Sequence, residues 1–414
     1  MTNSVEVCVV GAGAAGLAAA RRLRAGGADV LVVEARDRVG GRAHTATLGG
    51  FDVDLGCGWL HSADQNPWTS LAEKLGLQID RTAPPWETPA FGDQGRDERA
   101  AFREAFAAFD AKVEEVARTG HDRPASELLE DGGRWNTVLD AVSTWYSGAE
   151  LDRISVLDYA AYADDDVNWR VVEGYGATVQ AYGEGVPVRL GVAVETIDRS
   201  GARLRLATSG GELFADQVVI AVPTPILADE RLKITPPLPE KIEAAAGLPL
   251  GLADKVVLRL DRPDLFEPDT GLFGRTDTLE TGSYHLRPFG RPLVEAFLGG
   301  RWARALEAEG PGASAAFAIE ELSAVFGSDL RKRLVPLAST AWGADPFALG
   351  SYSHALPGCA GAREVLARPV EDRLFFAGEA CSRDAFSTAQ GAYATGIAAA
   401  EQALRASGKL APAD

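Results

Sequence analysis

Residues 5–42 read VEVCVVGAGAAGLAAARRLRAGGADVLVVEARDRVGGR, and this stretch decides the fold. An apolar, β-branched run from Val5 to Val10 leads into three spaced glycines, Gly11, Gly13 and Gly16. A segment rich in Ala, Leu and Arg follows, and these residues favour helix. The order predicts a strand, a tight turn and a helix, which is the arrangement that binds a dinucleotide.

Each position of this turn has a physical reason. Gly11 lets the chain turn sharply, Gly13 lacks the Cβ that would keep a pyrophosphate off the backbone, and Gly16 lets the helix lie close to the strand. The free N–H groups at the helix start, at Ala15 and its neighbours, hold the phosphates together with the helix dipole. We therefore expect a doubly wound α/β domain around a dinucleotide.

A second apolar run, Val30–Val33, ends at Glu34. The carboxylate can accept hydrogen bonds from both ribose hydroxyls of an adenosine and would repel a 2′-phosphate. Two adjacent glycines then allow another close backbone approach, and the arginine after them can neutralise the pyrophosphate. The cofactor-binding residues predicted here are Glu34, Ala35, Arg36, Gly40, Gly41 and Arg42.

With the pattern E-x-x-x-R-x-G-G-R at 34–42, the chain resembles the flavin-containing amine oxidase family, and its motifs are most similar to those of bacterial polyamine-oxidase-like enzymes. Related FAD enzymes such as protoporphyrinogen oxidase and phytoene desaturase share the pattern, so it defines the cofactor better than the reaction. The resemblance implies FAD in a glutathione-reductase-like Rossmann domain and a second, α+β substrate-binding domain.

Size, charge and cysteine content narrow the function classes. The chain has 414 residues, 46% of them hydrophobic, enough for a large core and two domains. The net charge of −18 argues against nucleic acid and anionic membranes as partners and attracts cationic amines. The four cysteines have no metal or disulfide spacing, and no apolar run reaches the ~18–20 residues of a membrane span. We expect a cytoplasmic protein, monomer or homodimer, without a metal.

Changes of pattern predict that the FAD-binding domain is discontinuous. A polar, broken connection at Pro84–Trp86 and Gly92–Gly95 marks a crossing into helices, and short strands from 188 to 222 indicate a β-meander, with 213–215 and 218–222 as separate strands. The FAD-binding domain is expected at 1–80, 181–245 and 345–414. The substrate domain is expected at 81–180, mostly helical, and 246–344, with sheet and helices.

Two local features of the substrate domain matter later. The three consecutive acids Asp164–Asp166 form either an acidic entrance for amines or a solvated turn. Ser314 is expected to be the N-cap of a helix that runs to Phe326.

The loop Gly58-Trp59-Leu60-His61, followed by Asn66-Pro67, resembles the polyamine oxidase branch of the family. The resemblance implies that Gly58 and Trp59 lie beside the flavin and that His61 faces the substrate. An imidazole titrates near neutral pH, so His61 can accept a proton from an ammonium. The alternative is that His61 only holds the loop through backbone hydrogen bonds.

Lys255 opens an alternating apolar strand, with Arg259 four residues on and on the same face. In the family, the lysine at this place holds a water against flavin N5. A buried ammonium favours the electron-rich reduced ring and can organise water or dioxygen. The alternative is an edge-strand lysine that reaches solvent.

Further site residues follow from the resemblance. Val194 lies where a valine backbone binds adenine, Trp342 packs near the isoalloxazine ring, and Tyr352 is one wall of the aromatic cage. Ser351 replaces the flavin-linked cysteine of monoamine oxidases, so FAD is non-covalent. Thr388 replaces the second cage tyrosine, which leaves the cage incomplete and permits a bulkier or longer substrate.

The C-terminal segment completes the predicted cofactor site. A strand, Leu374–Phe376, runs into Gly378 and Glu379, and Glu379 would bind the ribityl or ribose region. A following helix begins near Thr388 and Ala389, and its N-terminus would stabilise the anionic reduced flavin.

The implied reaction is the oxidation of a C–N bond by FAD. Hydride passes from the carbon next to the nitrogen to flavin N5, the imine hydrolyses, and O2 reoxidises the flavin to give hydrogen peroxide. The predicted catalytic residues are Lys255, His61, Tyr352 and Thr388, and a polyamine or other secondary or primary amine is the expected substrate. The alternatives are an amino-acid oxidase that uses Arg287 or Arg301, a desaturase or porphyrinogen-type dehydrogenase, and a non-catalytic flavoprotein module. The sequence leaves the orientation of His285, Arg287 and Arg301 open.

Overall fold

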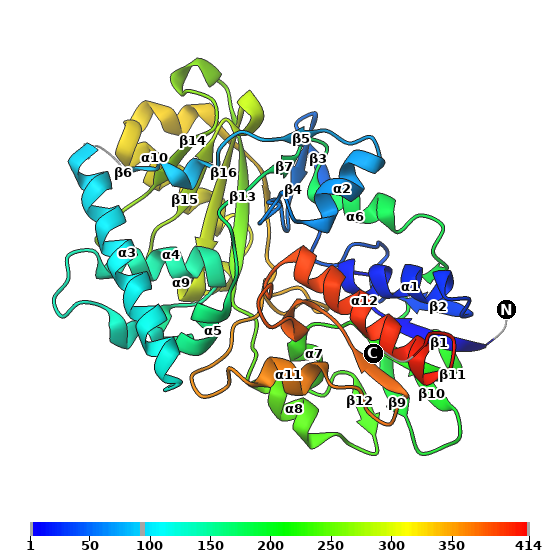
Figure 1. Cartoon of the computed structure of the whole chain (residues 1–414). Coiled ribbons are helices and arrows are strands. Elements are labelled where there is room, and N and C mark those ends of the chain that lie inside the picture. The colour runs from blue at the N-terminus through cyan, green and yellow to red at the C-terminus, as the bar shows by residue number, and fades with distance from the viewer. Residues whose placement is uncertain (1–2, 92–95, 412–414) are drawn as a thin grey trace.

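Two β-sheets, each with its own helices, make up the computed structural model, which describes residues 3–91 and 96–411 (Figure 1). The expected connection at Gly92–Gly95 lies outside the described residues. Among the helices that these ranges contain, none combines the length and apolarity needed to cross a bilayer.

The eight-stranded sheet is built around the opening strand. Strand β1 pairs in parallel with β2 on one side and with β11 on the other, so that Val10 lies beside both Val33 and Ile220. The sheet order is β12-β9-β10-β11-β1-β2-β8, with β18 also paired to β11. The strands are β1 (Ser4–Val10), β2 (Val30–Val33), β8 (Val188–Arg189), β9 (Val194–Asp198), β10 (Leu204–Thr208), β11 (Gly211–Ile220), β12 (Lys233–Thr235) and β18 (Leu374–Phe376).

Strand β11 corrects the sequence-based expectation of two short strands. Its first half pairs antiparallel with β10, and its second half pairs in parallel with β18, while β1 pairs with it from Phe214 to Ile220, across the change of partner. Because β1 supplies continuous hydrogen bonding on one side, the chain stays extended across the change of partner. The expected β-meander is present as β9–β10–β11.

Helices cover both faces of this sheet. On one face α1 and α12 lie against each other, and a Cβ on Gly396 of α12 would come within 2.2 Å of the Ala15 carbonyl oxygen. Small residues therefore allow the close contact seen in Figure 1. The helices of this part are α1 (Ala14–Ala25), α2 (Pro67–Lys74), α6 (Tyr175–Tyr182), α7 (Thr224–Ala228), α8 (Pro239–Ala246), α11 (Ala362–Ala367) and α12 (Ala389–Ala406).

The six-stranded sheet has the order β17-β13-β16-β15-β14-β6. Its strands are β6 (Ala90–Phe91), β13 (Ala253–Leu260), β14 (Thr270–Phe273), β15 (Ser283–Leu286), β16 (Leu293–Gly299) and β17 (Leu334–Ser339). The helices beside it are α3 (Arg96–Thr119), α4 (Asn136–Ser147), α5 (Val156–Ala161), α9 (Gly300–Glu309) and α10 (Ala313–Phe326). Two short pairs, β3 (Thr45–Leu48) with β4 (Phe51–Asp54) and β5 (Ile79–Asp80) with β7 (Arg170–Val171), stand apart from both sheets.

The expected N-cap at Ser314 is wrong. Helix α10 begins at Ala313, after Gly312 with a φ of +95°, and Ser314 is buried inside the first turn. A glycine can adopt the left-handed backbone that makes this sharp entry, which a serine cap in an extended conformation would not give.

A buried ion pair ties the two parts of the molecule together. Asp158 of α5 accepts hydrogen bonds from Nε and Nη2 of Arg363 of α11 at 2.6 and 2.8 Å. Both side chains are 2% exposed, and the guanidinium lies 3.7 Å from the centre of the Phe386 ring. Removing one partner would leave an uncompensated buried charge, so the pair holds α5 against α11.

Candidate functional site

A cavity of about 1020 Å³ is lined by residues of both sheets. Of the residues predicted for the site, all except Gly16 line it. They are Gly11, Gly13, Ala15, Glu34, Ala35, Arg36, Gly40, Gly41, Arg42, Gly58, Trp59, His61, Val194, Lys255, Trp342, Tyr352, Gly378, Glu379, Thr388 and Ala389. Residues far apart in the sequence therefore meet at one place.

The three glycines of the opening turn have three different environments. Gly11 has a φ of +101°, and a Cβ on Gly16 would lie 1.8 Å from the Gly11 carbonyl oxygen. A Cβ on Gly13 would come no closer than 3.9 Å to any atom in the described part of the chain, and it would enter the cavity. Gly11 and Gly16 thus serve the backbone, while Gly13 leaves room for a ligand.

The start of α1 offers unused donors to the cavity. Gly13 is the N-cap and no side chain caps the helix, while Ala14 and Ala15 of the first turn line the cavity. Glu34 is buried and accepts hydrogen bonds from the Ala12 and Arg36 amides at 2.7 and 2.9 Å. These features fit the phosphates and the adenosine ribose of FAD.

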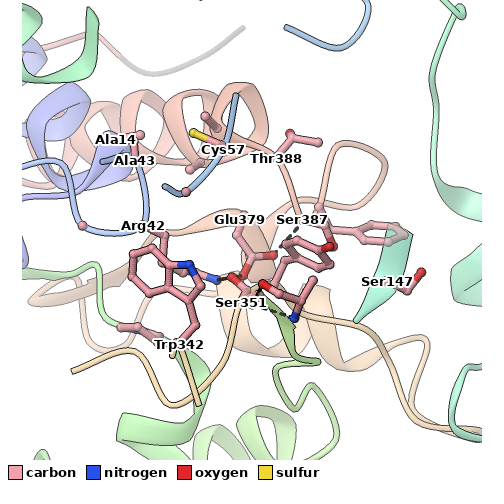
Figure 2. A pocket seen from close by; sticks show the side chains of 18 of the residues that line it. Ala14, Arg42, Ala43, Cys57, Ser147, Trp342, Ser351, Glu379, Ser387 and Thr388 are labelled. Atoms are coloured by element: carbon pink, nitrogen blue, oxygen red, sulfur yellow. Dashed lines mark hydrogen bonds and ion pairs between the residues drawn. The ribbon is translucent and has the colours of Figure 1, made fainter. Parts of the chain in front are cut away.

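Arg42 and Glu379 form an ion pair on the floor of the cavity, with Arg42 Nη1 2.9 Å from Glu379 Oε1 (Figure 2). Glu379 also accepts hydrogen bonds from the Ser353 hydroxyl and the Ser387 amide. Burial alone would raise the pKa of Glu379, but Arg42, Ser353, Arg363 and the Ser387 amide together hold the pKa below its ordinary value. The carboxylate is therefore charged at neutral pH and can accept hydroxyl hydrogen bonds.

Lys255 is buried in the interior of the six-stranded sheet, because β13 lies between β16 and β17. Its ammonium donates to the Asp54 carbonyl at 2.7 Å and lies 5.1 Å from the Phe297 ring centre. The alternative of an edge-strand lysine reaching solvent is therefore wrong, whereas Arg259 on the same face is exposed. One of three N–H groups is used among the described contacts, which leaves donors for a water molecule.

Trp342 and Ser351 line the same cavity, and Arg42 Nη1 donates to the Ser351 carbonyl at 2.8 Å (Figure 2). The Trp342 amide donates to Asp254, and its indole N–H donates to the Leu55 carbonyl at 3.1 Å, so the ring is fixed at both ends. The Ser351 hydroxyl donates to the Ala253 carbonyl and accepts from the Ala253 amide. Because a serine has no sulfur, this position cannot form a thioether bond to a flavin.

Tyr352 and Thr388 are both committed to structural hydrogen bonds. The Tyr352 hydroxyl donates to the Trp145 carbonyl, and burial raises its pKa, so the ring is neutral and fixed. The Thr388 hydroxyl donates to the Ala385 carbonyl and accepts from the Gly391 amide as the N-cap of α12. Thr388 therefore positions the helix start beside the cavity, and a catalytic role for it stays a prediction.

His61 faces two oxygen acceptors through one ring nitrogen. Its Nδ1 lies 2.6 Å from Asn168 Oδ1 and 3.3 Å from Asp164 Oδ2. A neutral ring that donates from Nδ1 keeps Nε2 as a proton acceptor. Burial would raise the pKa of Asp164, but the hydrogen bond and charge of His61 and the neighbouring donors hold it below its ordinary value.

The guanidinium of Arg170 packs against the ring of Trp59, an aromatic residue of the cavity wall. Trp59 packs edge-on against Trp86, with 4.3 Å between the ring centres, and Arg170 lies 4.9 Å from the Trp59 ring centre. Arg170 is paired with Asp80 and Asp269, and Asp269 also binds His285. This buried network holds the wall of the cavity in place.

The structure shows the orientation of Arg287 and Arg301, which the sequence left open. Arg287 donates to the Phe266 and Gly290 carbonyls, and Arg301 pairs with Asp152 at the surface. Neither lines the cavity, whereas His285 does. Neither of these two arginines is therefore placed to bind a substrate carboxylate in the cavity.

Sequence reasoning missed several cavity residues. His354 is 5% exposed, and neither of its ring nitrogens has a hydrogen-bond partner among the described residues. Asp110 and Glu114 of α3 join Asp164 and Asp166 along the cavity. The one available signal was the spacing of Asp110 and Glu114, which puts both on one helix face. The other contacts are tertiary and leave no local pattern.

Comparisons with known proteins agree with this geometry. The family model for flavin-containing amine oxidoreductases matches residues 14–160 and 154–404. Polyamine oxidase 2 of Arabidopsis thaliana is 30% identical over 97% of this chain and 88% of its own length. Polyamine oxidase 4 of Oryza sativa subsp. japonica is 31% identical over 96% of this chain and 88% of its own.

Two solved structures share the fold. A putrescine oxidase bound to putrescine superposes with a TM-score of 0.80 at 20% identity, covering 97% of this chain and 99% of its own. Cyclohexylamine oxidase from Brevibacterium oxydans IH-35A has a TM-score of 0.78 at 22% identity and covers 96% of this chain and 98% of its own. The doubly wound domain with its discontinuous sequence is thereby confirmed.

Proposed function

The chain belongs to the family of flavin-containing amine oxidoreductases and is an FAD-dependent amine oxidase, and we propose that the amine it oxidises is a diamine or polyamine. Bound FAD supplies the redox chemistry, accepting hydride from the carbon next to the nitrogen and passing electrons to dioxygen. The chain's own residues bind and orient the amine, remove its proton and hold the charges around the ring.

The observation that carries the proposal is the acidic rim of the cavity. Asp110 and Glu114 of α3 and Asp164 and Asp166 of the following loop line it, and Glu114 and Asp166 are exposed at its opening. Burial, then the charges of Glu114 and Asp166, raise the pKa of Asp110 to about 6. Because these carboxylates repel one another, a cation among them is favoured. A diamine can place its second ammonium there, whereas a monoamine has no second ammonium.

His61 is placed to prepare the reacting nitrogen. Hydride leaves from a carbon next to a neutral amine, whereas the amine arrives as an ammonium. Nε2 of His61 can accept that proton, and Asp164, 3.3 Å from Nδ1, stabilises the resulting imidazolium. Tyr352 and Trp342 supply fixed aromatic surfaces that orient the amine.

The proposal is tested by anaerobic mixing of the purified FAD protein with 1,4-diaminobutane and with butylamine, followed through flavin absorbance. We expect the diamine to bleach the flavin with a second-order rate constant about tenfold larger, since the exposed carboxylates of Glu114 and Asp166 can pair with the second ammonium. Equal rates for the two amines would contradict the proposal. No bleaching by spermine, spermidine or either probe would favour a non-catalytic flavoprotein.

Two substitutions on α3 form a matched pair. Glu114→Gln removes a carboxylate that lines the cavity, whereas Glu115→Gln removes its exposed neighbour, which does not. We expect the first to reduce the preference for the diamine about threefold and the second to leave it unchanged. The same response to both substitutions would mean that overall charge alone sets the preference.

We also infer a cytoplasmic location and no nucleic acid or membrane partner. The net charge of −18 repels polyanions, and Cys8, Cys57, Cys359 and Cys381 are free thiols, as is usual in reducing compartments. Fractionation of the producing cells tests the location, and recovery in a membrane or secreted fraction would contradict it. Size-exclusion chromatography with light scattering distinguishes monomer from homodimer.

A further inference from the structure

Asp254 of β13 is a buried carboxyl group whose two oxygens have different surroundings. The side chain is 1% exposed, and alternation along the strand turns it away from the face of Lys255. Its Oδ1 accepts hydrogen bonds from the Thr340 hydroxyl at 2.8 Å and from the Trp342 amide at 3.0 Å. Its Oδ2 is buried and has no donor among the described residues. Burying a charged oxygen without a donor is costly, so Oδ2 is the place where a proton fits.

A second carboxyl group contacts Asp254. Glu307, near the end of α9, lies within hydrogen-bonding reach of the Asp254 side chain. Its Oε1 accepts the Gly343 amide at 2.8 Å, and a Cβ on Gly343 would lie 2.5 Å from its Oε2. Two carboxylates have no proton to donate to each other, so this contact is a hydrogen bond only when one of them is protonated. A proton on Asp254 Oδ2 gives both groups a partner.

The electrostatics of this contact also favour a shared proton. Burial, and then the hydrogen bond and charge of Glu307, raise the pKa of Asp254 to about 7, whereas the Trp342 amide and the Thr340 hydroxyl lower it. The groups that chiefly set this pKa include no cation. Two carboxyl groups in contact titrate as a unit, so the proton belongs to the pair.

The other groups near Asp254 do not supply a compensating positive charge. They are apolar, neutral, on the other face of the strand or bound to a backbone carbonyl: Leu298 of β16, Tyr352, Lys255 of β13 and Arg304 of α9. Burial, and then the charge of Asp254, raise the pKa of Tyr352, so this hydroxyl stays protonated. A fully ionised pair would therefore consist of two adjacent negative charges.

The two carboxyl groups hold the segment 340–343, which follows β17. They accept hydrogen bonds from one hydroxyl and two amides of these four residues. The Thr340 hydroxyl also accepts from the Lys255 amide at 2.8 Å, and the Thr340 amide donates to the Lys255 carbonyl at 2.9 Å. Trp342 and Lys255 both line the cavity. The contact between the carboxyl groups therefore supports two residues of the site from behind.

We propose that Asp254 and Glu307 are positioning residues of the flavin site: they share one proton, and the hydrogen bond that it makes holds Trp342 and the segment around it at the cavity. The inference goes beyond the proposed function and does not depend on which amine is oxidised. When the proton passes to solvent as the pH rises, the two negative charges repel each other and the segment loses its support. FAD then binds more weakly.

Infrared difference spectra of the FAD-loaded protein between pH 9 and pH 5 detect the shared proton through the C=O stretch of a protonated carboxyl group. Asp110 and Asp140, each with a pKa raised by burial to about 6, contribute to the same spectrum, so the assignment comes from variants. Asp254→Asn keeps the acceptor oxygen and adds an N–H donor toward Glu307. We expect it to lack one wild-type band, and the exposed Glu309→Gln of α9 to keep them all. The same bands in wild type and Asp254→Asn would overturn the proposal.

The pH dependence of stability gives a second test with a defined sign. Folded Asp254 keeps its proton up to about pH 7, whereas the unfolded chain loses it near the ordinary value of 3.8. Its contribution to stability is therefore complete below pH 3.8 and falls as the pH rises to 7. An amide does not titrate, so the unfolding temperature of FAD-loaded Asp254→Asn should rise relative to wild type from pH 5 to pH 7. A constant or falling difference would contradict the shared proton.

FAD binding tests the positioning role without any amine. We expect Asp254→Ala to raise the Kd for FAD about tenfold, because Trp342 and Glu307 lose a partner, and Asp254→Asn to change it less than about twofold. The factor by which the Kd rises between pH 6 and pH 9 should be about fivefold larger for wild type than for Asp254→Asn. A Kd raised equally in both variants, or an identical pH dependence in wild type and Asp254→Asn, would overturn the proposal.

These measurements remain decisive in two adverse cases. If Asp254→Ala does not fold, the infrared, unfolding and FAD-binding comparisons of Asp254→Asn still test the shared proton. If the FAD-loaded protein fails to oxidise diamines, the proposed function is overturned, but the FAD affinities and spectra keep their meaning because no amine is present.

Discussion

The cofactor side and the substrate side of the cavity are built in different ways. On the side that we expect to hold the cofactor, backbone shape dominates: Gly11 and Gly16 allow a turn after which Gly13, Ala14 and Ala15 line the cavity. On the substrate side, side chains from separate elements converge, such as Asp110 of α3, Lys255 of β13 and His354. A site formed by backbone groups requires glycines at a fixed spacing in the sequence. A site formed by side chains has no such local pattern, because the fold brings together residues from distant segments.

The most direct test of this difference is to substitute alanine for each of two glycines, Gly16 and Gly13. In Gly16→Ala the Cβ would lie 1.8 Å from the Gly11 carbonyl oxygen, so the turn must shift. We expect the free energy of unfolding to fall by about 3 kcal/mol, with loss of FAD. Gly13→Ala has room in the protein but not in the ligand site, so it should keep the stability of the FAD-free protein and lose FAD binding. Thermal unfolding and flavin absorbance of both variants decide this, and equal unfolding temperatures would refute the distinction.

On the substrate side, Lys255→Met tests a single charge. We expect reoxidation of the reduced flavin by dioxygen to slow about 100-fold, because the family resemblance assigns this ammonium to the flavin and the substitution removes its charge and its N–H donors. Arg259→Met on the same strand face is the control, since Arg259 is exposed and paired with Asp261. Stopped-flow reoxidation measures both, and an unchanged rate in Lys255→Met would remove Lys255 from the mechanism.

Glu379→Gln tests the ion pair on the cavity floor. The pKa of Glu379 lies below its ordinary value of 4.5, so its stabilising contribution is complete above that pH and is lost as the pH falls through the lower value. We expect Glu379→Gln to cost about 2 kcal/mol at pH 7, because Arg42 loses its buried partner, and to make stability less dependent on pH below 4.5. Unfolding temperatures from pH 7 to pH 3 measure this, with the exposed Glu371→Gln as control. A pH dependence identical to wild type would contradict the assignment.

The smallest effect is expected at Asp110. Its pKa is raised to about 6, so protonation stabilises the folded protein as the pH falls through 6 and removes one charge from the rim. Each KM has a factor by which it rises between pH 7 and pH 5. For 1,4-diaminobutane this factor should be about threefold larger than for butylamine. Asp110→Asn should abolish this difference. Steady-state kinetics at the two pH values would contradict the prediction if the difference persisted in the variant.

What the sequence could predict follows from this division. The sequence could predict that the glycine turn, Glu34 and the Gly378-Glu379 strand end belong to one site, because each is a local pattern with one backbone geometry. The structure places these residues along one cavity. Lys255 and Tyr352 were named only through family resemblance, since a lysine or tyrosine in a strand or loop has no signature of its own. His354 was missed for the same reason: its lack of a partner is a property of packing.

Two local predictions failed because neighbours decided the structure. Strand β11 continues through the expected break since β1 supports it on one side, and α10 starts from Gly312 instead of from the Ser314 hydroxyl. In both places tertiary pairing or backbone freedom outweighed the residue preference.

The buried Asp158–Arg363 pair has a kinetic consequence. Because it ties α5 to α11 beside the cavity, opening the two parts would separate two charges with 2% exposure. Capture of the amine should then follow diffusion into a rigid, preformed mouth instead of waiting for a hinge to open. The long-range field of a chain with net charge −18 would steer cations to that mouth, so the association rate should fall steeply with ionic strength.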